Sequence, residues 1–250
     1  MSSRRITELE SRLVVPAPAG GFTEGELAGL PLPVQRYLRA AIAPGTPLAL
    51  SANLEMRGRI KIGRWMRFRA GEVLAPHRGF VWPARVGGLI SGHDGYLDGL
   101  GAMRWKLAGF LTVAHAEGPD VSRSAAGRAG AEAIWLPTCL LPRFDVNWSV
   151  HGEHEIACQF RVDETPIDLR MSLDAEGRLR SVAFDRWGDP DNTGTWGWHR
   201  AGGEFSGYAT FDGITIPAEG RFGWFFGTDR WASGDFFHYQ ITDLSPVTDR

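Results

Sequence analysis

The amino-acid sequence predicts a mainly β (α+β) domain. About eleven or twelve antiparallel strands are expected to form a large curved sheet, or half barrel, around one central helix. Three observations predict this fold class. Apolar and polar residues alternate along most of the chain, which is typical of strands with one buried and one exposed face. Short turns, many with glycine, separate these segments, and such hairpin connections make a sheet antiparallel. One alanine-rich stretch near the middle of the chain interrupts the alternation.

Residues 1–29 are predicted to form an N-terminal extension, and residues 30–250 a single antiparallel β domain. Within the extension, a short helix is expected over residues 6–13, before a linker rich in Pro, Gly and Ala. A second, amphipathic helix is expected between Pro33 and Pro44, because apolar residues recur there at the spacing of one helical face.

A hairpin is predicted to join residues 48–62 and 65–74, since apolar and charged residues alternate in both segments and Gly63 lies between them. Further strands are expected near residues 77–84, 86–92, 96–98, 102–107 and 110–115. Within this run, Asp94 and Gly95 are expected to form the turn of a hairpin.

A central helix is expected near residues 120–141, because its alanines favour helix and Asp120 or Ser122 can cap its start. Strands are expected again near residues 146–150, 155–162, 167–173, 178–185, 203–211, 214–225 and 235–242. Residues 187–198 are expected to form a polar, glycine-rich loop. So wide a twisted sheet normally curls, and we therefore expect the helix to fill its concave side.

The charges of the chain are nearly balanced, with a net charge of −2 and both signs interspersed along the sequence. This balance argues against nucleic acid as a partner and against electrostatic docking on an anionic membrane, since both need a basic field. No apolar run is long enough to span a bilayer or to act as a secretory signal, so no integral membrane segment is expected and the predicted location is the cytoplasm. The two cysteines, Cys139 and Cys158, are predicted to be buried free thiols.

Three short motifs resemble functional ones but lack a required residue. Residues 151–155 hold histidines and glutamates, but not in the H-E-x-x-H order of zinc peptidases. Residues 189–194 resemble a calcium loop, but Arg200 stands at the twelfth position in place of Glu. Residues 99–101 lack the third glycine of a dinucleotide-binding loop. The sequence therefore predicts neither a metal site nor a cofactor.

Two polar groups are candidates for a functional site. The first is the cluster of Arg85, His93, Asp94, Tyr96 and Lys106, near one edge of the sheet, some of which neighbouring strands would bring to one opening. The alternative is that Asp94 caps a turn beside a surface histidine.

The second group is Arg128 and Glu132, which lie one helical turn apart on the central helix. They form either a surface pair or, if the helix fills the sheet, a buried pair that anchors a polar head group. Asp94 and Glu132 are the candidate catalytic residues. The ten tryptophans indicate either an aromatic core or an aromatic-lined cavity. The predicted ligand-binding residues are Trp82, Arg85, Tyr96, Met103, Trp105, Arg128, Trp187 and Trp224.

Over about residues 30–242 the chain resembles a bacterial family of domains of unknown function. The resemblance is carried by the segments Leu32–Leu38, Phe80–Arg85, Asp94–Tyr96, Gly99–Met103 and Lys106–Gly109, and by Arg128, Glu132, Trp135, Leu136 and Pro137. It implies no known chemistry. The strand–helix–strand layout also resembles the lipoprotein-carrier architecture, an antiparallel half barrel that holds an acyl chain.

The leading hypothesis is a binding module, in which sheet and helix enclose an aromatic-lined pocket for a hydrophobic, acyl- or polyketide-like small molecule. It requires a cavity of roughly 300 Å³ or more. The alternative is a cofactor-independent hydrolase, isomerase or cyclase acting on a hydrophobic metabolite in the same pocket, which burial of Asp94 or Glu132 would favour. A third hypothesis is an interaction module, with an exposed apolar patch and no pocket. The sequence leaves the oligomeric state open.

Overall fold

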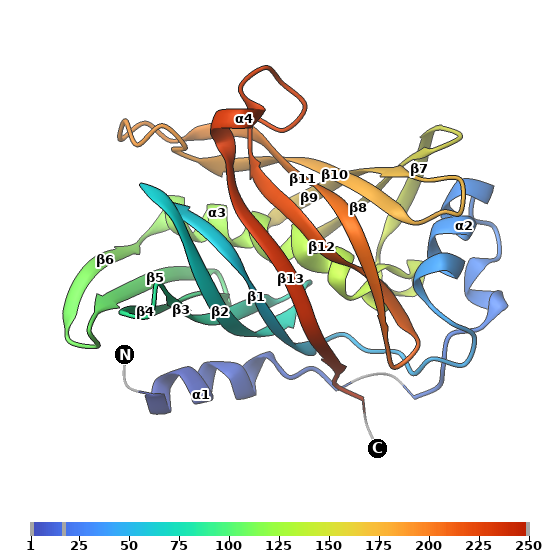
Figure 1. Ribbon diagram of the computed structural model, residues 1–250. Helices are drawn as coiled ribbons and strands as arrows, with labels where there is room; N and C mark the ends of the chain where they lie inside the picture. The colour runs from blue at the N-terminus through green and yellow to red at the C-terminus, as the bar shows by residue number, and fades with distance from the viewer. Residues whose placement is uncertain (1–2, 17–18, 249–250) are drawn as a thin grey trace.

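The computed structural model of the chain describes residues 3–16 and 19–248. Within them, thirteen strands form one antiparallel sheet in the order β6-β5-β4-β3-β2-β1-β13-β12-β11-β10-β9-β8-β7 (Figure 1). The strands are β1 Ala52–Ile62, β2 Arg64–Ala75, β3 Gly79–Val86, β4 Ile90–Leu97, β5 Leu100–Leu107, β6 Leu111–Glu117, β7 Asn147–Gly152, β8 Glu155–Val162, β9 Thr165–Leu173, β10 Leu179–Gly188, β11 Gly197–Phe211, β12 Ile214–Trp224 and β13 Asp235–Pro246. The predicted fold class, a curved antiparallel sheet around an internal helix, is confirmed, with thirteen strands instead of eleven or twelve.

Two runs of hairpins meet in the middle of the sheet. Strands β1 to β6 lie in sequence order on one side and β7 to β13 on the other, and β13 pairs with β1. The sheet is unclosed, with β6 and β7 as its edges. Its two halves nevertheless approach each other across the concave side, where the hydroxyl of Tyr96 donates a hydrogen bond to Asp163 Oδ2 at 2.6 Å.

Helix α3 (Pro119–Ala131) lies on the concave side, behind the sheet in Figure 1, and packs against β5, β9 and β10. The remaining helical segments are α1 Ser3–Leu13, η1 Glu24–Leu27, α2 Leu32–Ala41, η2 Glu132–Trp135, η3 Pro137–Leu140, η4 Pro142–Phe144 and α4 Trp231–Gly234. The main core fills the space between sheet and helix, and the buried free thiols of Cys139 and Cys158 lie in it, as predicted.

The N-terminal segment covers part of the outer face of the sheet. Leu13, at the end of α1, packs with Val81 and Leu97 in a second, smaller cluster. Phe22 and Leu27, which belong to the predicted extension, are buried in the main core. No helix in the described part of the chain is both long and apolar enough to cross a membrane.

The central helix is shorter than the predicted 120–141. It ends at Ala131, and the chain continues through the 3-10 turns η2, η3 and η4. Pro137 has no N–H to continue a helix and disfavours helical geometry in the residue before it. Accordingly, Leu136 has φ −137° and ψ 66°. The change to 3-10 turns lies next to the site described below.

The predicted turn at Asp94 and Gly95 is wrong. Both residues lie inside β4, and Asp94 pairs with Trp82 of β3. The turn before β4 instead contains Gly87 and Gly88, with φ of 58° and 81°, a conformation that glycine adopts at little cost. The predicted loop over residues 187–198 is also shorter, because β10 extends to Gly188 and β11 begins at Gly197.

Candidate functional site

Helix α3 packs closely against the concave face of the sheet because the helix face that it buries there consists of small residues. Ala126, Gly127, Ala129 and Gly130 are all buried. A Cβ atom at Gly130 would lie 2.6 Å from side-chain atoms of Ile167 on β9, so only glycine fits at this distance. The close approach brings the end of α3, with its polar side chains, against the inner faces of β2, β3 and β4.

Arg128, near the end of α3, is the centre of a buried polar cluster. Its Nε donates to Glu132 Oε1 at 2.7 Å, and its Nη1 donates to Asp94 Oδ2 at 3.2 Å. Its Nη2 lies 3.5 Å from Glu72 Oε1. Burial alone lowers the pKa of a guanidinium, but the carboxyl groups of Glu132, Glu72 and Asp94 outweigh it and hold the pKa of Arg128 above its usual range. Arg128 therefore stays charged.

Two aromatic rings also pack against the guanidinium group of Arg128. Its central carbon lies 4.2 Å from the ring centre of Phe80 and 5.1 Å from that of Trp82. Both distances are in the range of a cation–π contact. Trp105 donates its Nε1 hydrogen to Asp94 Oδ1 at 2.9 Å and packs against Trp82. Asp94 is thus satisfied on both oxygens, by Arg128 and by Trp105.

Glu72 on β2 is the most deeply buried acid of the cluster. Its side chain is 0% exposed, and neither of its carboxyl oxygens has a hydrogen-bond partner. Burial raises the pKa of Glu72 well above its usual range, and the negative charge of Glu132 raises it further, whereas Arg128 lowers it. Burial and the neighbouring charge of Glu132 therefore favour the protonated form of Glu72.

The cluster contains buried carboxyl oxygens without a partner. Three carboxyl oxygens lack one, both of Glu72 and Oε2 of Glu132. A single proton can join only two of them, so at least one acceptor remains for a water molecule or a ligand. Within the described residues, no His, Cys, Asp and Glu side chains are grouped so as to hold a metal ion. The cation of this cluster is Arg128 itself.

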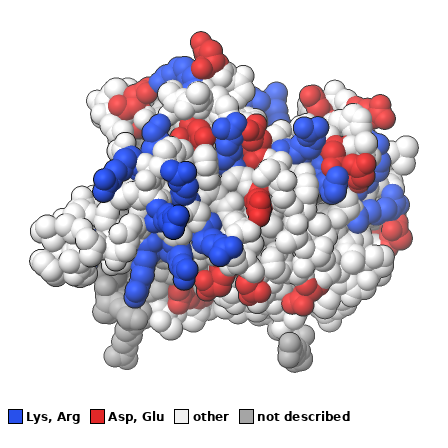
Figure 2. Space-filling view, in the orientation of Figure 1, with Lys and Arg blue, Asp and Glu red and all other residues white. Residues whose placement is uncertain are grey.

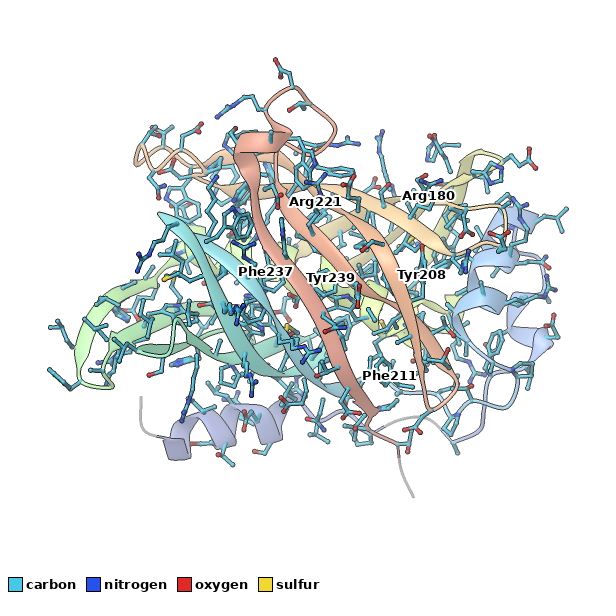
Figure 3. The ribbon with its side chains drawn as sticks, in the orientation of Figure 1. Arg180, Tyr208, Phe211, Arg221, Phe237 and Tyr239 are labelled. Carbon is cyan, nitrogen blue, oxygen red and sulfur yellow. The ribbon has the colours of Figure 1, made fainter. Side chains whose placement is uncertain are left out.

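Glu132 and Arg128 also form part of the wall of a cavity between the sheet and the helix. The cavity has a volume of about 210 Å³ and is otherwise lined mainly by aromatic rings. The aromatic residues that line it include Trp82, Trp135, Phe184, Phe222, Trp224 and Phe237. Figure 3 shows Phe237 and Tyr239 on β13, and their rings stack with a centroid distance of 5.9 Å. The volume is below the ~300 Å³ that the binding hypothesis required.

Arg186 of β10 brings a second cation to the cavity wall. Its Nε donates to the carbonyl of Ser124 at 3.3 Å, and its guanidinium lies 5.0 Å from the ring centre of Trp224. Burial, together with the positive charge of Arg128, lowers the pKa of Arg186 to about 10. The cluster and the cavity wall thus bring two guanidinium groups together with three carboxyl groups, and burial disfavours the charged form of one of these, Glu72.

Comparison with known proteins identifies the family of the chain. The model of the family of unknown function DUF6544 matches residues 20–236. The chain belongs to this family. The search of curated proteins found no match. The predicted resemblance to a family of unknown function is therefore confirmed, and every polar residue of the cluster lies inside the matched segment of this DUF6544 chain.

Solved structures with a similar course of the chain are distant in sequence. A LolA superfamily protein from Nitrosomonas europaea is 8% identical, with a TM-score of 0.47, and the match covers 87% of this chain and 93% of that one. A DUF1329 family protein from Desulfovibrio piger is 13% identical, with a TM-score of 0.37, and the match covers 79% of this chain and 86% of that one.

The DUF6544 chain brings together part of the predicted site. Trp82, Arg128 and Trp224, together with Glu132, line the cavity. Asp94 and Trp105 lie one contact away, because Asp94 binds Arg128 and Trp105 binds Asp94. Of the two interpretations of Arg128 and Glu132, a surface pair or a buried pair, the structure has the buried one.

Four other predicted ligand-binding residues lie elsewhere. Arg85 is exposed on the outer face of the sheet. Tyr96 binds Asp163 at the seam between the two halves. Met103 packs into the core beside Asp94. Trp187 donates to Asp120 at 2.8 Å, near the start of α3.

The prediction that some polar residues of β3, β4 and β5 meet at one opening holds for three of the five. Arg85, His93 and Lys106 line a hollow on the outer face, whereas Asp94 and Tyr96 point to the concave side. Successive residues of a strand point to opposite faces, so His93 and Asp94 cannot both enter one site.

Glu72 and Arg186 are the polar site residues that the sequence analysis missed. The signal for Glu72 was present, because it continues the alternation of Phe68 and Ala70 on the inner face of β2. An acid at an inward position of a strand indicates a buried polar group that needs a partner. Arg186 carried no such signal, since it fell near the boundary of the predicted loop.

Proposed function

We propose that this DUF6544 protein binds a compact, mostly apolar molecule with one neutral polar group in the cavity between α3 and the sheet. The observation that carries the proposal is a buried carboxyl oxygen without a partner beside an aromatic-lined cavity. Such a site combines apolar walls with few polar groups, which is typical of small-molecule binding sites.

The size of the cavity limits the ligand. A volume of 210 Å³ holds about seven water molecules at their volume in the liquid. This favours a single ring or a short branched chain over a long acyl chain. We expect the polar group to be a hydroxyl or amide, because such a group can donate its hydrogen to Glu132 while its oxygen accepts from Arg186.

The first experiment is native mass spectrometry of the purified protein, followed by denaturing extraction of any small molecule that it retains. A second uses benzyl alcohol and ethylbenzene in titration calorimetry, since the two have nearly the same shape and benzyl alcohol has a hydroxyl where ethylbenzene has a methyl group. We expect benzyl alcohol to bind at least tenfold more tightly, because a hydrogen bond to a charged group contributes about 1.5–3 kcal/mol. Equal affinities for the two compounds would contradict the proposed hydrogen bonds between the ligand and the polar residues of the cavity.

Two variants separate the cavity from its polar group. Ala131→Leu places a larger side chain in the cavity wall and is expected to abolish binding of both probes. Ala232→Leu, on an exposed position of α4, is the matched control and leaves binding unchanged. Glu132→Gln is expected to weaken benzyl alcohol binding and to leave ethylbenzene binding unchanged. Near-ultraviolet circular dichroism checks that each variant keeps its native packing.

A second candidate function is proton-transfer catalysis in the same cavity. The specific observation is the pair of buried acids, Glu72 and Glu132, beside an apolar space, in which burial and the charge of Glu132 raise the pKa of Glu72. Carboxyl pairs in such surroundings act as general acid and base. Phenylacetone has exchangeable α-hydrogens and is a suitable probe in deuterated water. Faster deuterium exchange of phenylacetone with the wild-type protein than with Glu132→Gln would support catalysis. Equal rates would contradict catalysis and leave ligand binding as the function of the cavity.

A further inference from the structure

A strongly basic surface lies on the outer face of the sheet, away from the cavity. The outward positions of β1, β2, β3 and β5 carry a set of cations that we call the basic face. It consists of Arg57, Arg59, Lys61, Arg67, Arg69, Arg85, Arg104 and Lys106. Figure 2 shows Lys and Arg gathered over β1 to β3. Although charges of both signs are interspersed in the sequence, alternation along the strands collects these cations on one side.

The cations of the basic face lack ion-pair partners in the part of the chain that the structure describes. Within the described residues, none of them forms an ion pair with an acidic side chain. Glu10, Glu55 and Glu219 line the same hollows as these cations but form no ion pair with them. Arg57 does donate to the side-chain oxygen of Gln240, at 2.8 Å.

The strand register places like charges directly opposite one another. Arg57 pairs with Arg69, Arg59 with Arg67, and Arg69 with Arg85. Like charges in such positions destabilise a sheet. An external anion that bridges neighbouring guanidinium groups would offset this repulsion, and phosphate oxygens suit it well.

Exposed apolar side chains lie at the end of the basic face. The β1–β2, β3–β4 and β5–β6 hairpins all turn at the same end of the sheet. Their tips expose Ile62 by 47%, Leu89 by 66%, Phe110 by 79%, Leu111 by 54% and Val113 by 51%. Two of the tips are joined by a hydrogen bond from the amide of Ala108 to the carbonyl of Leu89, at 2.8 Å. In Figure 2 the β5–β6 hairpin projects at the left as an uncharged lobe beside the basic face.

We propose that this end of the molecule docks on an anionic phospholipid bilayer, with the hairpin tips in the interfacial layer and the basic face on the headgroup phosphates. Basic residues attract an anionic surface, and apolar side chains beside them enter the boundary between headgroups and acyl chains. A nucleic acid would engage the arginines but would leave Leu89, Leu111 and Ile62 without a partner. The proposal goes beyond ligand binding in the cavity and does not depend on it.

The test is co-sedimentation of the full chain with vesicles. Vesicles of phosphatidylglycerol and phosphatidylcholine in equal amounts are compared with vesicles of phosphatidylcholine alone. We expect binding to the anionic vesicles only, and we expect it to weaken as salt is added, since salt screens exposed charges. Arg59→Gln/Arg67→Gln/Arg69→Gln should weaken binding on the order of 100-fold, because each such residue contributes a factor of roughly five.

Two further variants complete the design. Leu89→Ser/Phe110→Ser/Leu111→Ser keeps the basic face but removes the apolar tips, and it should also lose affinity for anionic vesicles. Arg161→Gln/Arg170→Gln/Arg180→Gln removes three exposed arginines from the other half of the sheet and should bind like the wild type. All these positions are exposed, so folding is retained, and circular dichroism verifies it.

Three results would overturn the proposal. The first is a wild-type protein that does not bind anionic vesicles at low salt. The second is an equal loss of binding in the control variant and the basic-face variant. The third is binding to heparin or duplex DNA without binding to vesicles, which would assign the basic face to a different polyanion.

Discussion

Arg128 organises the site at the scale of single residues. One guanidinium contacts three carboxyl groups from three elements, β2, β4 and η2, and lies against two aromatic rings. Arginine suits this position because its planar fork of donors serves several acceptors at once while its faces stack on aromatic rings. Lysine would offer a single point charge.

Glu72 makes the stability of the protein depend on pH. Its pKa is raised by folding, so the stability it contributes is present below its unfolded pKa of about 4.5 and is lost as the pH rises through the raised folded value. Replacing Glu72 with Gln removes this titration. We therefore expect Glu72→Gln to gain stability relative to the wild type as the pH rises from about 5 to about 8 in urea unfolding. Glu164→Gln, at a fully exposed position, is the control, and a pH-independent difference between Glu72→Gln and wild type would contradict the prediction.

Removal of Arg128 should be far more damaging than removal of a surface arginine. Arg128→Met leaves the buried carboxyl groups without their cation, and breaking such a buried network costs about 3–5 kcal/mol. Arg161 forms an exposed pair with Glu164, and such pairs contribute about 0–1 kcal/mol. Urea unfolding of Arg128→Met and Arg161→Met measures both values. Similar losses for the two variants would show that the cluster does not act as a buried network.

At the scale of elements, α3 determines the site by how closely it approaches the sheet. Its buried glycines and alanines let the backbone lie near β9 and β10. The helix then changes to the 3-10 turn η2, which begins with Glu132. The same short segment thus supplies the cation of the cluster and one of its acids, and it also forms the cavity wall.

Two neighbouring glycines of α3 test this close approach. Alanine is favoured over glycine by about 1 kcal/mol inside a helix. At Gly127 the nearest atom to an added Cβ is 3.7 Å away, so Gly127→Ala should be neutral or stabilising. At Gly130 an added Cβ meets Ile167 at 2.6 Å, and overpacking of about 1–3 kcal/mol should make Gly130→Ala destabilising. Thermal unfolding of the two variants measures both changes in stability. Equal changes would contradict a tight contact between α3 and β9.

At the scale of the whole molecule, the sheet curls so far that turns from its two halves meet. Asp163, in the turn between β8 and β9, accepts from the Tyr96 hydroxyl and from the amide of Gly99, in the turn between β4 and β5. Burial raises the pKa of Tyr96, and the bond to Asp163 raises it further, so the phenol stays protonated and keeps donating. The contact between Tyr96 and Asp163 thus closes the concave side at the end of the sheet opposite the β1–β2, β3–β4 and β5–β6 turns.

Removal of the hydrogen bond between Tyr96 and Asp163 should increase local opening in both halves of the sheet. Tyr96→Phe removes one hydrogen bond to a carboxylate, which contributes about 1.5–3 kcal/mol. We expect faster amide hydrogen exchange at both turns, near residues 98–101 and 163–165, with little change in β12 and β13. Tyr208→Phe is the control, because its hydroxyl donates to the carbonyl of Leu179 within one half of the sheet. Faster exchange confined to one turn would contradict a role in joining the halves.

The two proposed sites occupy different faces of one sheet. Ile60 of β1 lines the cavity, and Ile62 of the same strand is exposed at the hairpin tip. The cavity and the proposed membrane-docking end are therefore neighbours along β1. Their tests remain separate, since the cavity variants leave the basic face unchanged.

The sequence by itself determined the local structure and part of the site. Alternation with a period of two marked the strands, because burial of one sheet face acts on every second residue. The same pattern and the alanine-rich stretch predicted the fold class, the internal helix and the pair of Arg128 and Glu132. Local patterns misplaced the turn at Asp94 and extended the helix past Ala131, since several turn and helix signals compete over such short distances.

Only the tertiary structure decided which side chains meet. Glu72 and Asp94 join Glu132 because β2, β4 and η2 come together in space, although their residues are far apart in sequence. The pairing of β13 with β1, the seam at Tyr96 and the collection of arginines on one face depend in the same way on strand register and sheet curvature. These contacts are long-range, and pattern within a segment carries no information about which distant segment will pack against it.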